Sequence, residues 1–183
     1  MTHSADKLLG EIKRYCSGDI RISERDLLAL HLFGASGFEI SIRSRFLSLM
    51  LSIESMLEPA KRSTSAIEIV ENTIAIVKSR NDLSCQERDS LQGSLNWLKN
   101  ESISLTGKKL AHSLLPDNTY CEMPCEKFFK HCYQVRSNLV HTGSPKIDED
   151  QFGKVAANLE VFVSDMLTAK FKDYGYGDKD ANR

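Results

Sequence analysis

The sequence predicts an all-α protein, a single helical bundle of six to eight helices. Apolar residues recur at spacings of three and four along most of the chain, and no segment alternates apolar and polar residues as a strand does. Serine and acidic residues stand where helices should begin, and glycine or proline where they should end. We therefore expect one helical domain over residues 1–172, followed by a flexible tail over residues 173–183, which is rich in glycine and charge.

Length and composition agree with one globular domain. The 183 residues are 41% hydrophobic and 27% charged, with 4 Pro and 10 Gly, as in ordinary folded proteins. No apolar run reaches the roughly 18 residues that a membrane span needs, and residues 1–10 lack the blocks of a signal peptide. The five cysteines form an odd count without paired spacing, which favours reduced thiols over a disulfide framework. We expect a cytoplasmic protein without a membrane partner.

The first two predicted helices contain the most apolar part of the chain. Ser23, followed by Glu24-Arg-Asp26, is typical of a helix start, and two glycines interrupt the helix behind it. The next helix runs from about residue 39 to residue 57 and stops before Pro59. Its apolar spacing predicts a central place in the bundle. The residues expected to face inward on it are Ile42, Phe46, Leu49, Met50, Ile53, Met56 and Leu57.

Two Ser-x-x-Glu sequences mark the middle of the chain. In Ser65 to Glu68 and in Ser84 to Glu87, the side chains are placed to satisfy free amides of a helix's first turn. They predict two helices joined by a short turn over residues 79–83, and a weaker helix over residues 105–115 should follow. The residues expected to face inward on the first two are Ile67, Val70, Ile74, Val77, Leu91, Leu95 and Leu98.

The last two predicted helices have clear boundaries. Pro124 suits a first helical position, Gly143 suits a left-handed stop, and Pro145 prevents resumption. A final helix should run from Asp148 to about Phe171. The inward residues should be Phe128, Phe129, Cys132, Val135, Leu139 and Val140 on the first of these helices, and Phe152, Val155, Leu159, Phe162, Met166 and Leu167 on the second.

Arg136 and His141, near the end of the helix that Gly143 closes, are the most informative polar pair. Five residues on an ideal helix separate them by about 140° and about 7.5 Å, so they can converge only on a cleft at the helix end. The guanidinium matches the geometry of a phosphate, and imidazole has an unperturbed pKa near neutrality. The alternative is structural: Arg136 pairs with an acid on a neighbouring helix, and His141 caps its own helix.

The segment Phe129 to Gly143, FKHCYQVRSNLVHTG, resembles the signature of the HEPN superfamily. It is most similar to the Apea-like branch, in which an aromatic-rich helix ends in Arg-Ser/Asn-x-x-Val-His-Gly. Upstream, Arg45-Phe-Leu with Glu54 further along the same helix looks like an earlier core helix of that branch. The two segments occur in the family's order, and the resemblance extends over residues 27–167.

The resemblance implies a helical bundle that forms a homodimer, in which two Arg…His motifs face one shared cleft. Many members are metal-independent endoribonucleases that act as toxins or defence effectors. In this chain His141 would be general base on the ribose 2′-hydroxyl or general acid on the leaving oxygen, and Arg136 would stabilise charge on the phosphate. RNA would be the substrate, no cofactor is implied, and a protein partner or antitoxin is left open. Other members have no activity and bind RNA, nucleotides or partners, which is the alternative function.

Further candidates surround this pair. Ser137 follows Arg136 where active members often carry Asn, Asp or His, and Thr142 stands between His141 and Gly143 where members have glycine directly after the histidine. Glu54, an acid among apolar neighbours, should pair with Arg45 or Arg136, or orient the cleft. The supporting candidates are Ser137, Asn138, Thr142, Tyr133 and Glu54, and the candidate RNA contacts are Lys127, Lys130 and Arg45.

Charge and ligand spacing limit the other possibilities. A formal net charge of −1 and a pI near 6.5 exclude binding of nucleic acid through the overall field, so any contact must be local. No metal site is predicted, because a set of Cys121, Cys125, His131 and Cys132 matches no common zinc spacing. His112, which follows Lys108 and Lys109, is expected at the surface, and a place along an RNA path is the alternative.

Overall fold

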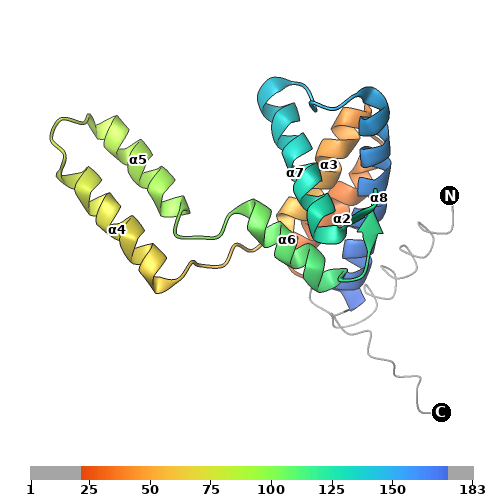
Figure 1. Cartoon of the computed structure of the whole chain (residues 1–183), viewed down its shortest axis with the longest axis horizontal. Helices are drawn as coiled ribbons and strands as arrows, with labels where there is room; N and C mark the ends of the chain where they lie inside the picture. Colours follow the sequence, from red (N-terminus) through yellow and green to blue (C-terminus); the bar gives the residue numbers. More distant parts are fainter. Residues whose placement is uncertain (1–21, 173–183) are drawn as a thin grey trace, which may run out of the picture. The chain divides into compact units, whose positions relative to one another are not determined.

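Seven α-helices and one short antiparallel ladder form the part of the chain that the computed structural model describes, residues 22–172 (Figure 1). The predicted all-α bundle of six to eight helices is therefore confirmed, and the tail predicted over residues 173–183 lies outside the described residues. The elements are α2 (Glu24–Ser36), α3 (Ile42–Ser55), α4 (Thr64–Ser79), α5 (Cys85–Trp97), α6 (Ile103–Leu114), β1 (Thr119–Tyr120), β2 (Met123–Pro124), α7 (Cys125–Thr142) and α8 (Glu149–Lys172).

The chain divides into two compact units. The first comprises the residues up to Met56 and those from Gly107 onward, and the second comprises Leu57–Thr106. Helices α2, α3, α7 and α8 pack on one another in the first unit, and α4 packs on α5 in the second. The predicted domain over residues 1–172 stays a prediction, and within it the segment from Leu57 to Thr106 forms a compact unit. None of the described helices is long and apolar enough to cross a membrane.

Helix α3 is the centre of the first unit, as its apolar spacing predicted. It contacts α2, α7 and α8, and Phe46, Leu49, Met50 and Ile53 have no exposed surface. The prediction for Ile42 is wrong, because the buried stripe starts one turn later and leaves Ile42 46% exposed at the beginning of the helix. This packing brings Glu54, near the end of α3, to the side of α7.

An aromatic cluster joins β1, α7 and α8. The ring centroids of Tyr120, Phe128 and Phe162 lie 4.9 to 5.4 Å apart, at distances typical of attractive ring contacts. The Tyr120 hydroxyl donates to Asp165 Oδ2 (2.7 Å) and accepts from Asn118 Nδ2 (3.1 Å). Burial, together with the bond to Asp165, raises the pKa of Tyr120 well above its usual value. The hydroxyl therefore stays protonated and keeps donating.

Helix α6 approaches α7 closely at one glycine. A Cβ placed on Gly107 would lie 2.0 Å from Cζ of Phe129, whose ring is fully buried. Phe129 also stacks on Tyr133, with 6.1 Å between ring centroids. Gly107 therefore gives the ring the space that any other residue's side chain would fill.

Two helix starts follow the predicted caps, and two predictions are wrong. Pro124, predicted at the first helical position, is the residue before α7 and belongs to β2. Ser23 accepts a hydrogen bond from Asp26 N, and Ser84 with Glu87 forms the predicted reciprocal pair. The predicted cap at Ser65 is wrong, because α4 starts two residues earlier and Ser63 accepts from Ala66 N at 3.4 Å. The preceding backbone fixes this register, since residues 60–62 pair with residues 99–101 through bonds such as Arg62 N to Lys99 O (2.9 Å).

The second unit covers its apolar residues only in part. Ile74 is buried, but Leu91 and Leu98, which were predicted to face inward, are 43% and 50% exposed. Helix α5 packs on α4, and a hairpin of two helices leaves the sides of both helices uncovered.

The predictions for α8, in the first unit, are confirmed, because all six of its predicted inward residues are buried.

Candidate functional site

Helix α7 carries the predicted pair and ends where the sequence predicts. Gly143 has φ of 70°, and its N–H donates to Leu139 O at 3.0 Å, which closes the last turn. Leu139 is buried at this end, whereas Val140, predicted inward, is 53% exposed because it is turned about 100° from Leu139. His141, the next residue along, is also exposed. It is therefore accessible to a ligand at the closed end of a rigid helix.

Arg136 is held by Glu54 of α3. Its Nη2 lies 3.1 Å from Glu54 Oε2, and the two side chains are 25% and 19% exposed. Of the two partners that the sequence left open for Glu54, the structure therefore selects Arg136. Burial raises the pKa of Glu54 above its ordinary value, and the nearby guanidinium opposes this rise without cancelling it. The other carboxylate oxygen of Glu54, Oε1, is buried and has no hydrogen-bond partner.

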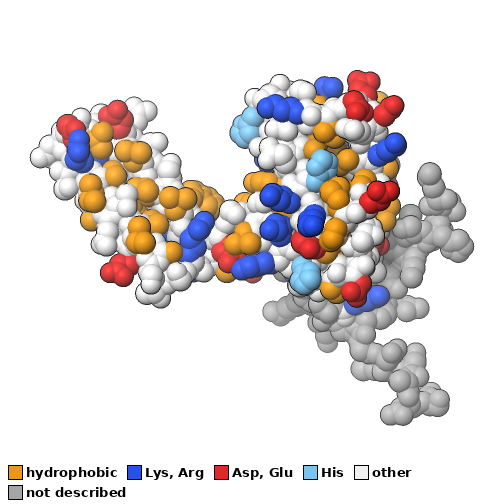
Figure 2. Space-filling model, viewed as in Figure 1, with side chains coloured by type: hydrophobic (Ala, Val, Ile, Leu, Met, Phe, Trp, Pro, Cys, Tyr) orange, Lys and Arg blue, Asp and Glu red, His pale blue; other side chains and the backbone are white. Residues whose placement is uncertain are grey.

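The face of α7 opposite its buried stripe is a row of polar residues, here called the polar row. It consists of Lys127, Lys130, Gln134, Ser137 and His141, which are spaced alternately three and four residues apart. Ser137 is half-buried, and the other four are exposed. Figure 2 shows Lys and Arg side chains gathered over the part of the first unit that contains α7. Two predicted RNA contacts, Lys127 and Lys130, thus share a face with the predicted catalytic histidine.

Asn138 and Thr142 shape the turn that follows α7. Asn138 accepts from Gln134 Nε2 (3.2 Å) and donates to Pro145 O (3.4 Å). The Thr142 hydroxyl donates to Asn138 O at 2.8 Å. These bonds keep the chain tight beyond Gly143, so both residues support the helix end on which His141 lies. Their observed contacts are with the protein itself.

Arg45 faces a different part of the first unit. Its Nη1 lies 4.0 Å from Glu160 Oε2 of α8, and its Nη2 donates weakly to Glu39 O at 3.5 Å. The Arg45 side chain is 40% exposed, yet its Nε is buried without a hydrogen-bond partner. The structure therefore does not bring Arg45 to Glu54, and it brings Tyr133, another candidate, against Phe129 in the core.

Sequence reasoning missed one group of side chains. His112 at the end of α6 lies with Cys125 and Glu126 at the start of α7, and one ligand atom from each lies within 4.8 Å of the others. Cys125 was considered only with other cysteines and His131. No spacing signal relates His112 to Cys125, because the intervening loop and two-stranded ladder set their proximity.

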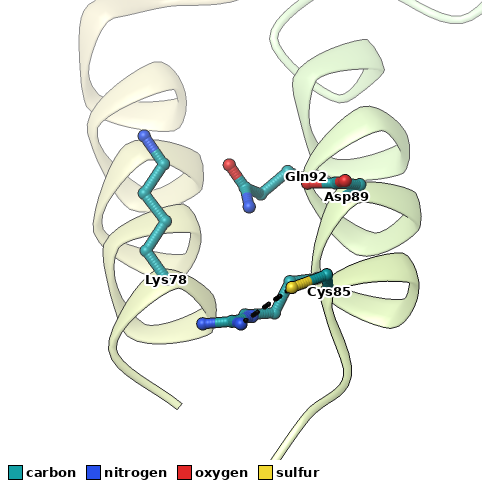
Figure 3. A pocket seen from close by; sticks show the side chains of 5 residues that line it. Lys78, Cys85, Asp89 and Gln92 are labelled. Atoms are coloured by element: carbon teal, nitrogen blue, oxygen red, sulfur yellow. Dashed lines mark hydrogen bonds between the residues drawn. The ribbon is translucent and has the colours of Figure 1, made fainter. Parts of the chain in front are cut away.

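A hollow between α4 and α5 lies within the second unit. Lys78 lines it from α4, and Cys85, Arg88, Asp89 and Gln92 line it from α5 (Figure 3). Arg88 Nη2 lies 3.5 Å from Cys85 Sγ, a weak contact. The hollow contains none of the residues predicted for the functional site.

Comparisons of this chain with protein-family models, with curated proteins and with solved structures give no match.

Proposed function

We propose that this chain is a metal-independent endoribonuclease of HEPN type, a cytoplasmic toxin or defence effector that acts as a homodimer. The observation that carries the proposal is His141, exposed in the last turn of α7 next to a left-handed glycine stop. Arg136 precedes it on the same helix, and the segment around both residues resembles the HEPN signature. Exposure of the imidazole meets the first requirement for proton transfer to a ligand.

The proposed reaction is attack of the ribose 2′-oxygen on the adjacent phosphorus. His141 of one subunit removes the 2′-hydroxyl proton as general base, and His141 of the other subunit protonates the leaving 5′-oxygen. The bond between the 2′-oxygen and phosphorus forms while the bond between phosphorus and the 5′-oxygen breaks. The products are a 2′,3′-cyclic phosphate and a free 5′-hydroxyl, and the reaction consumes no metal ion or cofactor. Arg136 stabilises the charge that develops on the phosphoryl oxygens. DNA lacks the nucleophile and should resist.

The geometry of one chain supports the requirement for a second copy. Arg136 and His141 are about 140° apart around α7, and the Arg136 guanidinium is occupied on one side by Glu54. A single α7 therefore presents one exposed histidine and one arginine, whose side chain is 25% exposed, in different directions. A second copy supplies the other imidazole, and the polar row of each α7 then offers Lys127 and Lys130 to the RNA backbone.

The test is cleavage of single-stranded RNA in EDTA by the wild type, His141→Ala and Arg136→Ala. Loss of general acid–base help should lower the rate by roughly 10² to 10⁴. A matched control is His31→Ala, because His31 is an exposed histidine on α2 and should leave the rate unchanged. Replacing the reacting nucleotide by its 2′-deoxy analogue should stop the reaction. Equal rates for His141→Ala and the wild type would refute the proposal.

A non-catalytic RNA-binding module is the second candidate. The observation that favours it is the ion pair between Arg136 and Glu54, in which both side chains are largely buried, as expected of a structural contact. In that case the wild-type protein binds RNA, and slows its migration in a gel, without cleaving it. Replacing a phosphate-contacting lysine of the polar row by alanine should weaken the salt dependence of RNA binding. The slope of log K against log salt concentration should become smaller by about one. Lys127→Ala and Lys130→Ala test this by binding titrations at several salt concentrations.

A further inference from the structure

Three side chains of different chemistry converge where α6 ends and α7 begins. Cys125 Sγ donates to Glu126 Oε2 at 3.3 Å, and His112 Nδ1 lies 4.0 Å from the same oxygen. All three ligand atoms lie within 4.8 Å of one another. Cys125 is fully buried, whereas the His112 side chain is 67% exposed and that of Glu126 is 32% exposed. The group therefore has one fixed, buried ligand and two that can adjust at the surface.

These separations are close to those of a tetrahedral metal site. Bonds of about 2.3 Å to sulfur and about 2.0 to 2.2 Å to nitrogen and oxygen place neighbouring ligand atoms about 3.3 to 3.6 Å apart. The sulfur–oxygen distance of 3.3 Å lies within a few tenths of an ångström of the value for such a pair. The imidazole needs to move by about an ångström, which the exposure of His112 permits because few neighbours restrain its rotamer.

The ligand types select the metal. We propose that His112, Cys125 and Glu126 bind one Zn²⁺ ion, with water in the fourth position. Imidazole and thiolate favour zinc or cobalt, whereas magnesium and calcium prefer oxygen ligands alone. Three protein ligands and one open position form a common arrangement for zinc in proteins.

Binding requires the thiol to lose its proton. The ion forms a bond to sulfur while the thiol proton leaves to solvent, with no change in oxidation state. Uptake of zinc should therefore release a proton.

The ion would join α6 to α7 across the loop that contains the two-stranded ladder. This loop includes Cys121 and Glu122 with φ of 47° and 62°, a conformation that non-glycine residues rarely adopt. Glu126 lies ten residues before Arg136 on α7, which is about 15 Å along the helix. The metal site is therefore separate from the proposed ribonuclease site, and a bound ion would link α6 to α7.

The experiment uses the full chain without an affinity tag, stripped with a chelator. Zn²⁺ is titrated against a competing indicator, and Co²⁺ is added in parallel to observe thiolate-to-metal charge-transfer absorption. The wild type should bind one ion per chain, show that absorption and melt at a higher temperature with zinc. Cys125→Ser should abolish the absorption, and His112→Asn should weaken zinc binding by at least about 100-fold.

Cys121→Ser is the matched control, because this neighbouring cysteine lies outside the proposed ligand set and should leave both signals unchanged. His112 is exposed, so its variant should fold even if Cys125→Ser does not. No ion bound by the wild type, or equal affinity in His112→Asn, would overturn the proposal. RNA cleavage in EDTA is measured separately, so either proposal can fail without the other.

Discussion

Two opposing effects act on the carboxylate of Glu54. Burial disfavours its charged form, and Arg136, 3.1 Å away, favours it. Since the pKa is raised, the desolvation effect is the larger one. The folded chain therefore holds a proton on Glu54 at a pH where the unfolded chain has released it. The resulting stability is complete below the ordinary value of 4.5 and is lost as the pH rises through the higher pKa of the folded state.

Glu54→Gln should remove this pH dependence. The unfolding free energy of the wild type, minus that of the variant, should fall as the pH increases from below 4.5 toward neutrality. Urea unfolding at several pH values, followed by circular dichroism, measures this difference. Leu51→Ala, an exposed and non-titrating position on α3, is the control and should shift the free energy equally at each pH. A difference that increases with pH would contradict the assignment of the dominant effect.

Residue chemistry was predictable from the sequence only within one helix. The sequence predicted the helix stop at Gly143, and this prediction is confirmed. The exposure of His141 is known only from the structure. The partner of Arg136 was left open, because helical spacing says nothing about which neighbouring helix faces a side chain. Glu54 is 82 residues away in sequence, and the choice between it and other partners depends on how α3 packs against α7.

At the scale of elements, the end of α7 depends on one backbone conformation. Gly143→Ala should lower the unfolding free energy by about 1 to 2 kcal/mol, because a left-handed φ of 70° forces Cβ toward the following carbonyl oxygen. Chemical denaturation measures the change. Gly153→Ala inside α8 is the opposite control: its Cβ meets nothing within 4 Å, and alanine should stabilise the helix by about 1 kcal/mol. Equal effects of the two variants would argue against a left-handed stop.

The helices were largely predictable because their apolar spacing and caps agree. The start of α4 shows the limit of such reasoning. Ser63 and Ser65 are both suitable caps, and the sequence pattern favoured Ser65 because Glu68 follows it three residues later. The backbone pairing of residues 60–62 with residues 99–101 decides in favour of Ser63. A tertiary contact of this kind has no local sequence signal.

At the scale of the whole molecule, the buried core of the first unit should contribute most of that unit's stability. Phe162 has no exposed surface and contacts both Tyr120 and Phe128, so Phe162→Ala should cost about 3 to 5 kcal/mol. Val161→Ala, one residue away and 54% exposed, should change the free energy by less than about 0.5 kcal/mol. Circular dichroism is the appropriate signal, because the single tryptophan, Trp97, lies in the second unit. Similar losses in both variants would mean that burial at Phe162 is not what stabilises the unit.

The division into two units was not predictable from apolar spacing. Helices α4 and α5 carry apolar patterns like those of α3 and α8, yet Leu91 and Leu98 remain exposed. The predicted inward residues of α8, and those of α3 other than Ile42, are buried. A pattern shows which face of a helix is apolar, but the number of helices that cover the face depends on how distant segments meet. The composition does differ, because all 8 Phe and 5 Tyr of the chain lie outside Leu57–Thr106.

The close approach of Gly107 to Phe129 links two positions whose substitutions should be coupled. Enlarging residue 107 is tolerable only if residue 129 becomes smaller, since both compete for the same volume. Chains descended from a common ancestor with this packing should therefore keep glycine at position 107 together with an aromatic residue at position 129, or change both residues. Such covariation would identify distant relatives by their shape, even where Arg136 and His141 have been lost.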